Sequence, residues 1–281
     1  MLMPLRRFNF IRLYGAIVFT FACLVSVPAQ QRPLITEDVD IIPPGSARIE
    51  AGIEFMQDAK FPLSGLRGDL TRVGVVGINI GLSPNVEFQI DGVLQNFLSI
   101  NSATPNPAIR RDFSRPDSTN DTGDFRLSTK IKLRNETRRA PSLGFRFGVE
   151  LPNSNETRGI GSNQTNAYGT ILFGNLGLGI FTAPTQAFTQ NDMLLYGFAG
   201  IVRVNKQINV AGEINGRANT RNGRAPLGTE PLSEARLGLQ VKASGLRFDF
   251  AGTAGLTDFS PRSGVTFGIT YDTPSIFTPV K

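Results

Sequence analysis

The sequence predicts an all-β protein, a single antiparallel transmembrane β-barrel of about 12 strands. Three observations support this prediction: apolar and polar residues alternate along most of the chain, short and long connections alternate, and the N-terminus has the features of a secretory signal. No segment after residue 30 approaches the ~18 consecutive apolar residues of a membrane-spanning helix. A closed barrel is then the remaining way to satisfy every backbone hydrogen bond in lipid.

The alternation is clearest between residues 234 and 243. One face collects Ala235, Leu237, Leu239, Val241 and Ala243, and the other collects Glu234, Arg236, Gly238, Gln240 and Lys242. Because successive side chains of a strand point to opposite faces, this segment presents one apolar and one charged face. A helix of the same sequence would distribute the charges around its circumference.

Segments with this pattern, separated by turn residues, are the predicted strands. They are residues 46–56, 69–82, 86–97, 123–134, 142–151, 165–173, 176–183, 193–204, 207–217, 233–243, 246–256 and 264–272. The alternation is weakest in 69–82 and 165–173, and the cluster of β-branched residues from 73 to 78 indicates a β-bulge in the former.

The connections between these strands alternate in length. The short ones are residues 83–85, 174–175, 205–206 and 244–245, with a slightly longer one at 135–141; the long ones are 57–68, 98–122, 152–164, 183–192, 218–232 and 257–263. Outer-membrane barrels have short periplasmic turns and longer outer loops. A first strand that starts on the periplasmic side places every short turn there.

A soluble β-sandwich is the alternative fold, because its strands also alternate. Predicted strands of about 10 residues favour the barrel, since strands of globular proteins are usually ~5–6 residues long. The scarcity of interfacial aromatic residues fits a membrane barrel less well: Trp is absent, and beyond the signal only Tyr168, Tyr196 and Tyr271 remain.

The N-terminal 29 residues read as a signal peptide. Arg6, Arg7 and Arg12 precede an apolar run, and the small residues near Ala29 suit cleavage after it. A retained anchor and a lipoprotein at Cys23 are the disfavoured alternatives. The predicted organisation is 1–29 signal peptide, 30–45 periplasmic N-terminal segment, 46–272 outer-membrane barrel and 273–281 C-terminal tail.

Composition narrows the chemistry of the mature chain. The sequence contains no His, and its one Cys is removed with the signal. Ser/His catalysis and His or Cys metal sites are therefore excluded, and no cofactor or enzyme activity is expected. The formal net charge of +6 falls to +3 without the three signal arginines, which gives little reason to expect nucleic-acid binding.

The polar faces of the strands would line the barrel lumen. The candidate lumen-lining residues carry both signs in similar number: Arg126, Lys130, Arg146, Arg236, Arg247, Glu87, Asp91, Glu150, Glu213 and Asp249. Such charges can brace the inner wall as ion pairs or set the preference of a pore. Bracing is the favoured interpretation for most of them, because ion-pair networks are common structural features.

Several short motifs resemble a known family. They are Arg32-Pro33-Leu34-Ile35-Thr36-Glu37-Asp38, Pro44-Gly45, Thr122-Gly123-Asp124, the stretch from Pro141 to Pro152, and Gly212-Glu213. Together they resemble the outer-membrane transporter-like barrels named after the meta-cleavage pathway of phenol degradation. The resemblance implies a barrel that passes small, often aromatic or hydrophobic, molecules. One departure is that residues 272–281 follow Tyr271, where such barrels often end on an aromatic residue.

The expected function is a passive outer-membrane channel or transporter for small molecules. The expected partners are the lipid bilayer, the outer-membrane assembly machinery and a small-molecule substrate. A barrel that serves as a structural or surface-interaction protein through its long loops is the alternative, and a barrel-embedded enzyme is the third reading.

Overall fold

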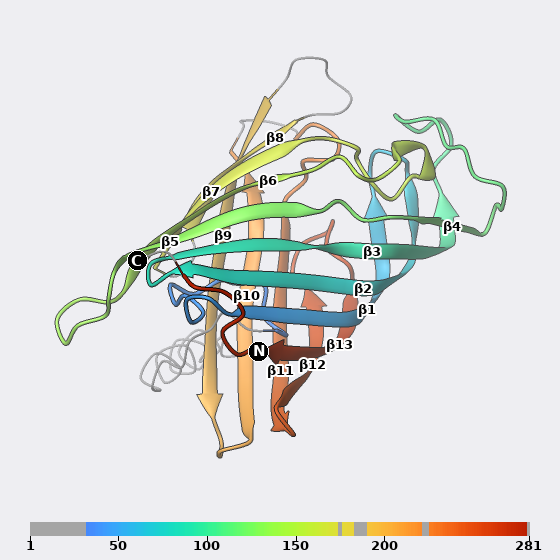
Figure 1. Ribbon diagram of the computed structural model, residues 1–281. Helices are drawn as coiled ribbons and strands as arrows, with labels where there is room; N and C mark the ends of the chain where they lie inside the picture. The colour runs from blue at the N-terminus through green and yellow to red at the C-terminus, as the bar shows by residue number, and fades with distance from the viewer. Residues whose placement is uncertain (1–31, 174–175, 183–189, 221–224, 280–281) are drawn as a thin grey trace, which may run out of the picture.

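The computed structural model describes residues 32–173, 176–182, 190–220 and 225–279, so the predicted signal peptide lies outside the described residues. These residues form an antiparallel β-barrel (Figure 1). Its strands are β1 (Ala47–Phe61), β2 (Leu66–Ser83), β3 (Val86–Ala103), β4 (Ser118–Asp121), β5 (Arg126–Arg134), β6 (Leu143–Glu150), β7 (Asn166–Leu172), β8 (Leu176–Thr182), β9 (Gln190–Arg203), β10 (Ile208–Asn219), β11 (Leu232–Ala243), β12 (Leu246–Gly255) and β13 (Ser263–Asp272). No helix in the described part of the chain is long and apolar enough to cross a membrane.

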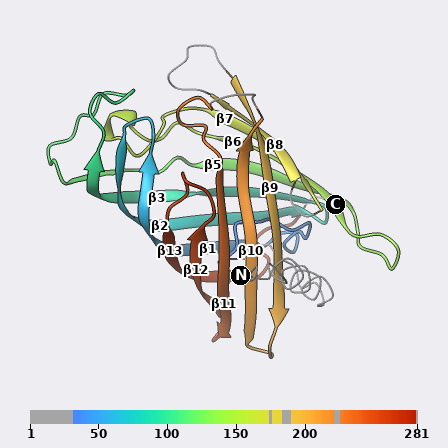
Figure 2. The same ribbon diagram turned by 180° about the vertical axis from the view of Figure 1, so that it is seen from behind.

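Twelve of these strands close into a ring, and β4 adds to the side of β3. Neighbours in sequence pair with one another, except that β3 pairs with β5 and the first strand pairs with the last. Figures 1 and 2, seen from opposite sides, show β1–β3 and β9–β11 as opposite walls. Closure removes the unpaired edges that an open sheet would expose.

All twelve predicted strands are present, with differences confined to their ends. The first three strands run further than expected, so that parts of the predicted loops 57–68 and 98–122 are paired strand, and β4 was not predicted. The extension is held by a buried apolar cluster that includes Met56, Leu66 and Leu98. The predicted bulge in β2 is confirmed, because the β1–β2 register shifts there and Gly74 has a φ of 67°.

The two faces of the wall differ as the alternation predicts. Leu239 lies on the outward face and is 44% exposed, whereas the adjacent Gln240 is completely buried. Phe248 is likewise exposed between the buried Arg247 and Asp249. The barrel therefore has an apolar exterior and a polar interior, the reverse of a soluble protein.

The N-terminal segment differs from expectation. The sequence predicted that residues 30–45 lie in the periplasm, but the described residues 32–42 run along the inside of the barrel. The backbone N–H groups of Ile35 and Thr36 donate to the Glu213 carboxylate, and that of Ile42 donates to Glu87. These inward-facing carboxylates supply hydrogen-bond acceptors that replace water for an extended backbone.

The hairpin between β1 and β2 contacts several long loops at one end of the barrel. The Ile109 N–H donates to the carbonyl of Leu63, and the Ser64 hydroxyl donates to that of Gly159. The Leu63 side chain also packs against Gly228, in the loop between β10 and β11. The hairpin tip therefore joins loops from separate parts of the ring at this end.

Candidate functional site

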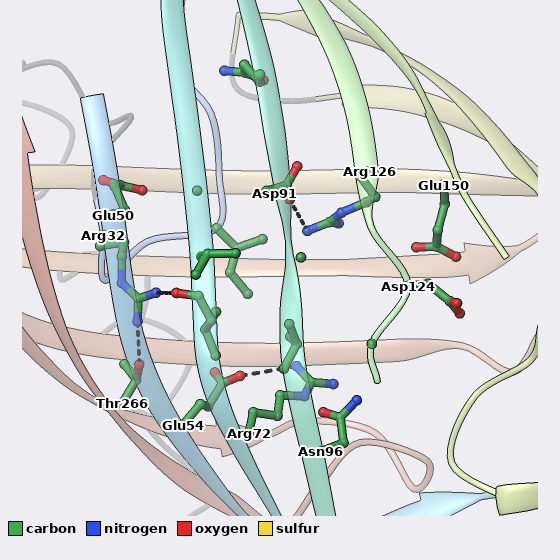
Figure 3. Close-up of a pocket in the computed structure, with 18 of the residues that line it drawn as sticks. Arg32, Glu50, Glu54, Arg72, Asp91, Asn96, Asp124, Arg126, Glu150 and Thr266 are labelled. Carbon is green, nitrogen blue, oxygen red and sulfur yellow. Dashed lines mark hydrogen bonds and ion pairs between the residues drawn. The ribbon is translucent and has the colours of Figure 1, made fainter. Parts of the chain in front are cut away.

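A polar cavity of about 460 Å³ lies inside the barrel beside the N-terminal segment (Figure 3). Its charged lining comes from six wall strands, from the connection before β5 and from the segment itself. These side chains are Arg32, Glu37, Glu50, Glu54, Arg72, Asp91, Asp124, Arg126, Arg146, Glu150 and Arg236. They meet because alternate residues of neighbouring strands share the inner face.

Register explains the central group of charges. Asp91 of β3 pairs with Arg126 of β5, which in turn pairs with Glu150 of β6. Arg126 Nη2 lies 2.5 Å from Asp91 Oδ1. Glu150 accepts a hydrogen bond from Asn166 and has no cation within ion-pair distance among the described residues. One row across three strands thus contains an ion pair and an adjacent carboxylate with no such partner.

A second group of charges lies around Glu54 of β1. Its two carboxylate oxygens lie 3.1 Å from Arg72 Nη1 and 3.2 Å from Arg236 Nη2. Arg236 also lies 3.5 Å from Glu213, the residue that binds the backbone of the N-terminal segment. This network joins β1, β2, β10 and β11 through the interior, which fits the bracing role expected from the sequence.

The acidic residues of the N-terminal segment meet basic residues of the wall. Lys130 Nζ lies 3.6 Å from Glu37, 3.7 Å from Asp38 and 3.3 Å from Glu87. Lys132, two residues along the same face, lies 3.0 Å from Asp40. The spacing of Glu37, Asp38 and Asp40 along the segment therefore matches the spacing of the inward-facing lysines along β5.

Arg32 anchors the start of the described segment. Its guanidinium donates to the Val75 carbonyl at 2.9 Å and to the Thr266 hydroxyl at 3.1 Å, and lies 3.5 Å from Asp249. The carbonyls of Arg32 and Pro33 accept hydrogen bonds from Gln240 and Arg236. The segment is thus bound by its backbone as well as by its charges.

The ten predicted lumen residues separate into two sets. Asp91, Arg126, Arg146, Glu150 and Arg236 line the cavity. Lys130, Glu87, Glu213 and Asp249 do not line it and contact the N-terminal segment, which Arg146 and Arg236 contact as well. Arg247 pairs with Glu50 at 3.1 Å. Sequence reasoning did not assign Arg32, Glu37, Asp38 and Asp40 to the site. The available signal was that Asp38 and Asp40 in the segment have the same spacing as Lys130 and Lys132 in β5.

The cavity arginines differ in their access to solvent. The side chains of Arg126 and Arg72 are 42% and 36% exposed, whereas that of Arg236 is 4% exposed. Arg126 and Arg72 are therefore the cations that a solute in the cavity would meet first. Within the described ranges, no group of three or more His, Cys, Asp or Glu residues is arranged to hold a metal ion.

The comparisons with known proteins give a structural likeness. No family model matches this chain, and no curated protein matches it in sequence. The chain is similar to the COG4313 outer membrane channel from Pseudomonas putida F1, at 11% identity and a TM-score of 0.57, over 85% of this chain and 100% of that one. At this identity the likeness shows that the two proteins share the antiparallel barrel fold.

Two other barrels align less closely. The translocator domain of the autotransporter NalP from Neisseria meningitidis has 12% identity and a TM-score of 0.38, over 93% of this chain and 95% of that one. OccAB3 from Acinetobacter baumannii has 11% identity and a TM-score of 0.23, over 76% and 67%. These scores are too low to support an inference about this chain.

Proposed function

We propose that this protein is an outer-membrane channel for small molecules, with a lumen narrowed by its own N-terminal segment. The observation that carries this proposal is the polar cavity inside a barrel whose exterior is apolar. An apolar exterior suits lipid, and a polar interior suits water and small solutes. The likeness to the COG4313 outer membrane channel supports the same function.

The size of the cavity and the sequence resemblance bear on the cargo. A cavity of about 460 Å³ suits a small molecule. We propose membership of the phenol-pathway barrel family on the short sequence motifs, and with it aromatic or hydrophobic cargo. The charged lining favours small polar solutes instead, so uptake of phenol and of a polar solute of equal size, such as glycerol, should be compared directly.

A barrel that does not transport is the second candidate. The specific observation that favours it is the filled interior: Arg32 to Ile42 is bound to the wall by backbone and side-chain hydrogen bonds. In this reading the ion pairs stabilise the barrel, and the long loops make the external contacts. Either function requires insertion by the outer-membrane assembly machinery after removal of the signal peptide.

Conductance separates the two candidates. The full mature chain and a variant lacking residues 32–43 would be reconstituted in planar bilayers at equal protein density. A channel is expected to give small single-channel events that become several times larger without the segment. An absence of events in both proteins, each shown to be folded by heat-dependent gel mobility, would leave the structural role as the function.

A further inference from the structure

A second cavity, of about 730 Å³, lies near the ends of β1–β4 and is lined in part by residues that the lumen does not use. Its wall contains Phe55, Thr71 and Phe97, which face away from the buried cluster of Met56, Leu70 and Leu98. Loop residues 113–115 and Arg158 also line it, as do Leu98 and Thr119, which are buried. Most of the strand residues in the lining lie on the outward face, so the cavity reaches the outer surface of the barrel beside the loop that contains residues 113–115.

Two rows of residues run across this outer surface. Phe55, Thr71, Phe97 and Asn120 are paired from strand to strand, and the next outward row contains Asp69, Ser99 and Ser118. The two phenylalanines of the first row continue the apolar exterior, in which Ile53 and Val73 are exposed. The second row is polar. The cavity therefore spans the boundary between the apolar belt and the polar end of the barrel.

Two arginines lie beside this boundary, Arg115 and Arg158. Arg115 is exposed, and the Arg158 guanidinium donates to the Asp112 carbonyl at 3.5 Å. In the described part of the chain, neither arginine has a carboxylate within ion-pair distance. The lining includes one carboxylate, Asp69, which accepts a hydrogen bond from the Asp58 N–H. Two arginines thus line a cavity whose apolar lining includes Phe55 and Phe97.

We propose that this cavity binds a lipid whose phosphate headgroup has a net negative charge, with acyl chains against Phe55 and Phe97 and the phosphate beside Arg115 and Arg158. Arginine pairs well with phosphate, because its planar guanidinium donates two parallel hydrogen bonds. Aromatic rings at the edge of the apolar belt offer a surface for the first methylene groups of the chain. The inference rests on the proposed membrane location and is independent of conduction.

The test is native mass spectrometry of the full mature chain in a neutral detergent. Lipid A, phosphatidylglycerol and phosphatidylcholine would be titrated separately, because the first two have a net negative charge, whereas in the third the choline cation balances the charge of the phosphate. The proposal expects retention of lipid A or phosphatidylglycerol, and the preferred one identifies the leaflet of origin. Equal retention of all three lipids, or of none, would overturn it.

Matched arginine variants locate the binding. Arg115→Gln is expected to weaken phospholipid binding about tenfold, the effect of one charged hydrogen bond, and the double change with Arg158→Gln is expected to weaken it further. Arg110→Gln is the control, since Arg110 is exposed on the same loop and outside the cavity. Heat-dependent gel mobility checks that each variant is folded. A folded Arg115→Gln protein with unchanged affinity would refute the site, whatever the conductance.

Discussion

The Lys130 Nζ lies 3.6 Å from Glu37 Oε2, and the Lys130 side chain is completely buried. The pair links the wall of the barrel to the segment that runs inside it. Arg126 lies on the same strand and face, yet its side chain is 42% exposed in the cavity. Two cations that are equivalent in the sequence pattern are therefore expected to have different roles, one in stability and one in conduction.

Removing the Lys130 charge should destabilise the barrel. Lys130→Met leaves Glu37, Asp38 and Glu87 without their shared cation, and breaking a buried pair in this way costs about 3–5 kcal/mol. The temperature at which the barrel loses its folded gel mobility is expected to fall. The exposed turn residue Lys206, changed to Met, should leave it unchanged. Equal midpoints for both variants would show that the pairs contribute nothing.

Removing the Arg126 charge should change ion preference. Arg126→Gln leaves the Asp91 and Glu150 carboxylates in the same row, so the cavity becomes more favourable to cations. The reversal potential in a salt gradient across a planar bilayer should shift toward cation selectivity. Arg138→Gln, in an exposed turn, is the control. Open channels with the wild-type reversal potential would contradict the assignment of Arg126 to the conduction path.

Adding one methyl group at Gly81 should loosen the N-terminal segment. A Cβ there would lie 2.5 Å from the Pro43 carbonyl oxygen and 2.7 Å from that of Ile42, both in the segment. Gly81→Ala is expected to make the segment more accessible to protease and to raise conductance. Gly252→Ala is the matched control, because a Cβ at that position meets no atom within 4 Å. The same protease pattern in both variants would show that the segment is not seated against β2.

A charge on the outer face should impair assembly. Leu239 is 44% exposed on the apolar exterior, where Arg or Lys at the middle of a membrane costs ~2–4 kcal/mol. Leu239→Arg is expected to reduce the yield of heat-modifiable barrel in the outer membrane. Leu239→Ala tests the loss of side-chain volume alone and should have a small effect. Normal assembly of the arginine variant would argue against lipid contact at this residue.

The strands were predictable because a period of two is imposed locally by a wall with one apolar and one polar face. The short β4 was not, since its four residues are too few to show a period. The N-terminal segment was misplaced for a different reason. Its partners are distributed over distant strands: Ile35 binds Glu213, 178 residues away, and Ile42 binds Glu87, 45 residues away. No local sequence pattern predicts contacts between residues so far apart in the chain.

The sequence predicted which residues of the candidate site face the interior, but not which of them the N-terminal segment covers. Alternation placed Lys130 and Arg126 on the polar face together, but burial of the lysine depends on Glu37, Asp38 and Glu87. Arg72 was not selected as a candidate, since it belongs to the strand whose bulge obscures the alternation. Charge signs along single strands cannot show which side chains the inserted segment covers.

The pairing of the first strand with the last has a kinetic consequence. The carbonyls of Gly45 and Ala47 accept hydrogen bonds from the Ile276 and Thr273 N–H groups, which lie just beyond β13. The inserted segment lies immediately before Gly45. Contacts between such distant parts of a chain form slowly, because a large loop must close first. The N-terminal segment must therefore already lie within the curved sheet when β1 pairs with β13. Closure of the barrel and filling of the lumen then become one late step of assembly.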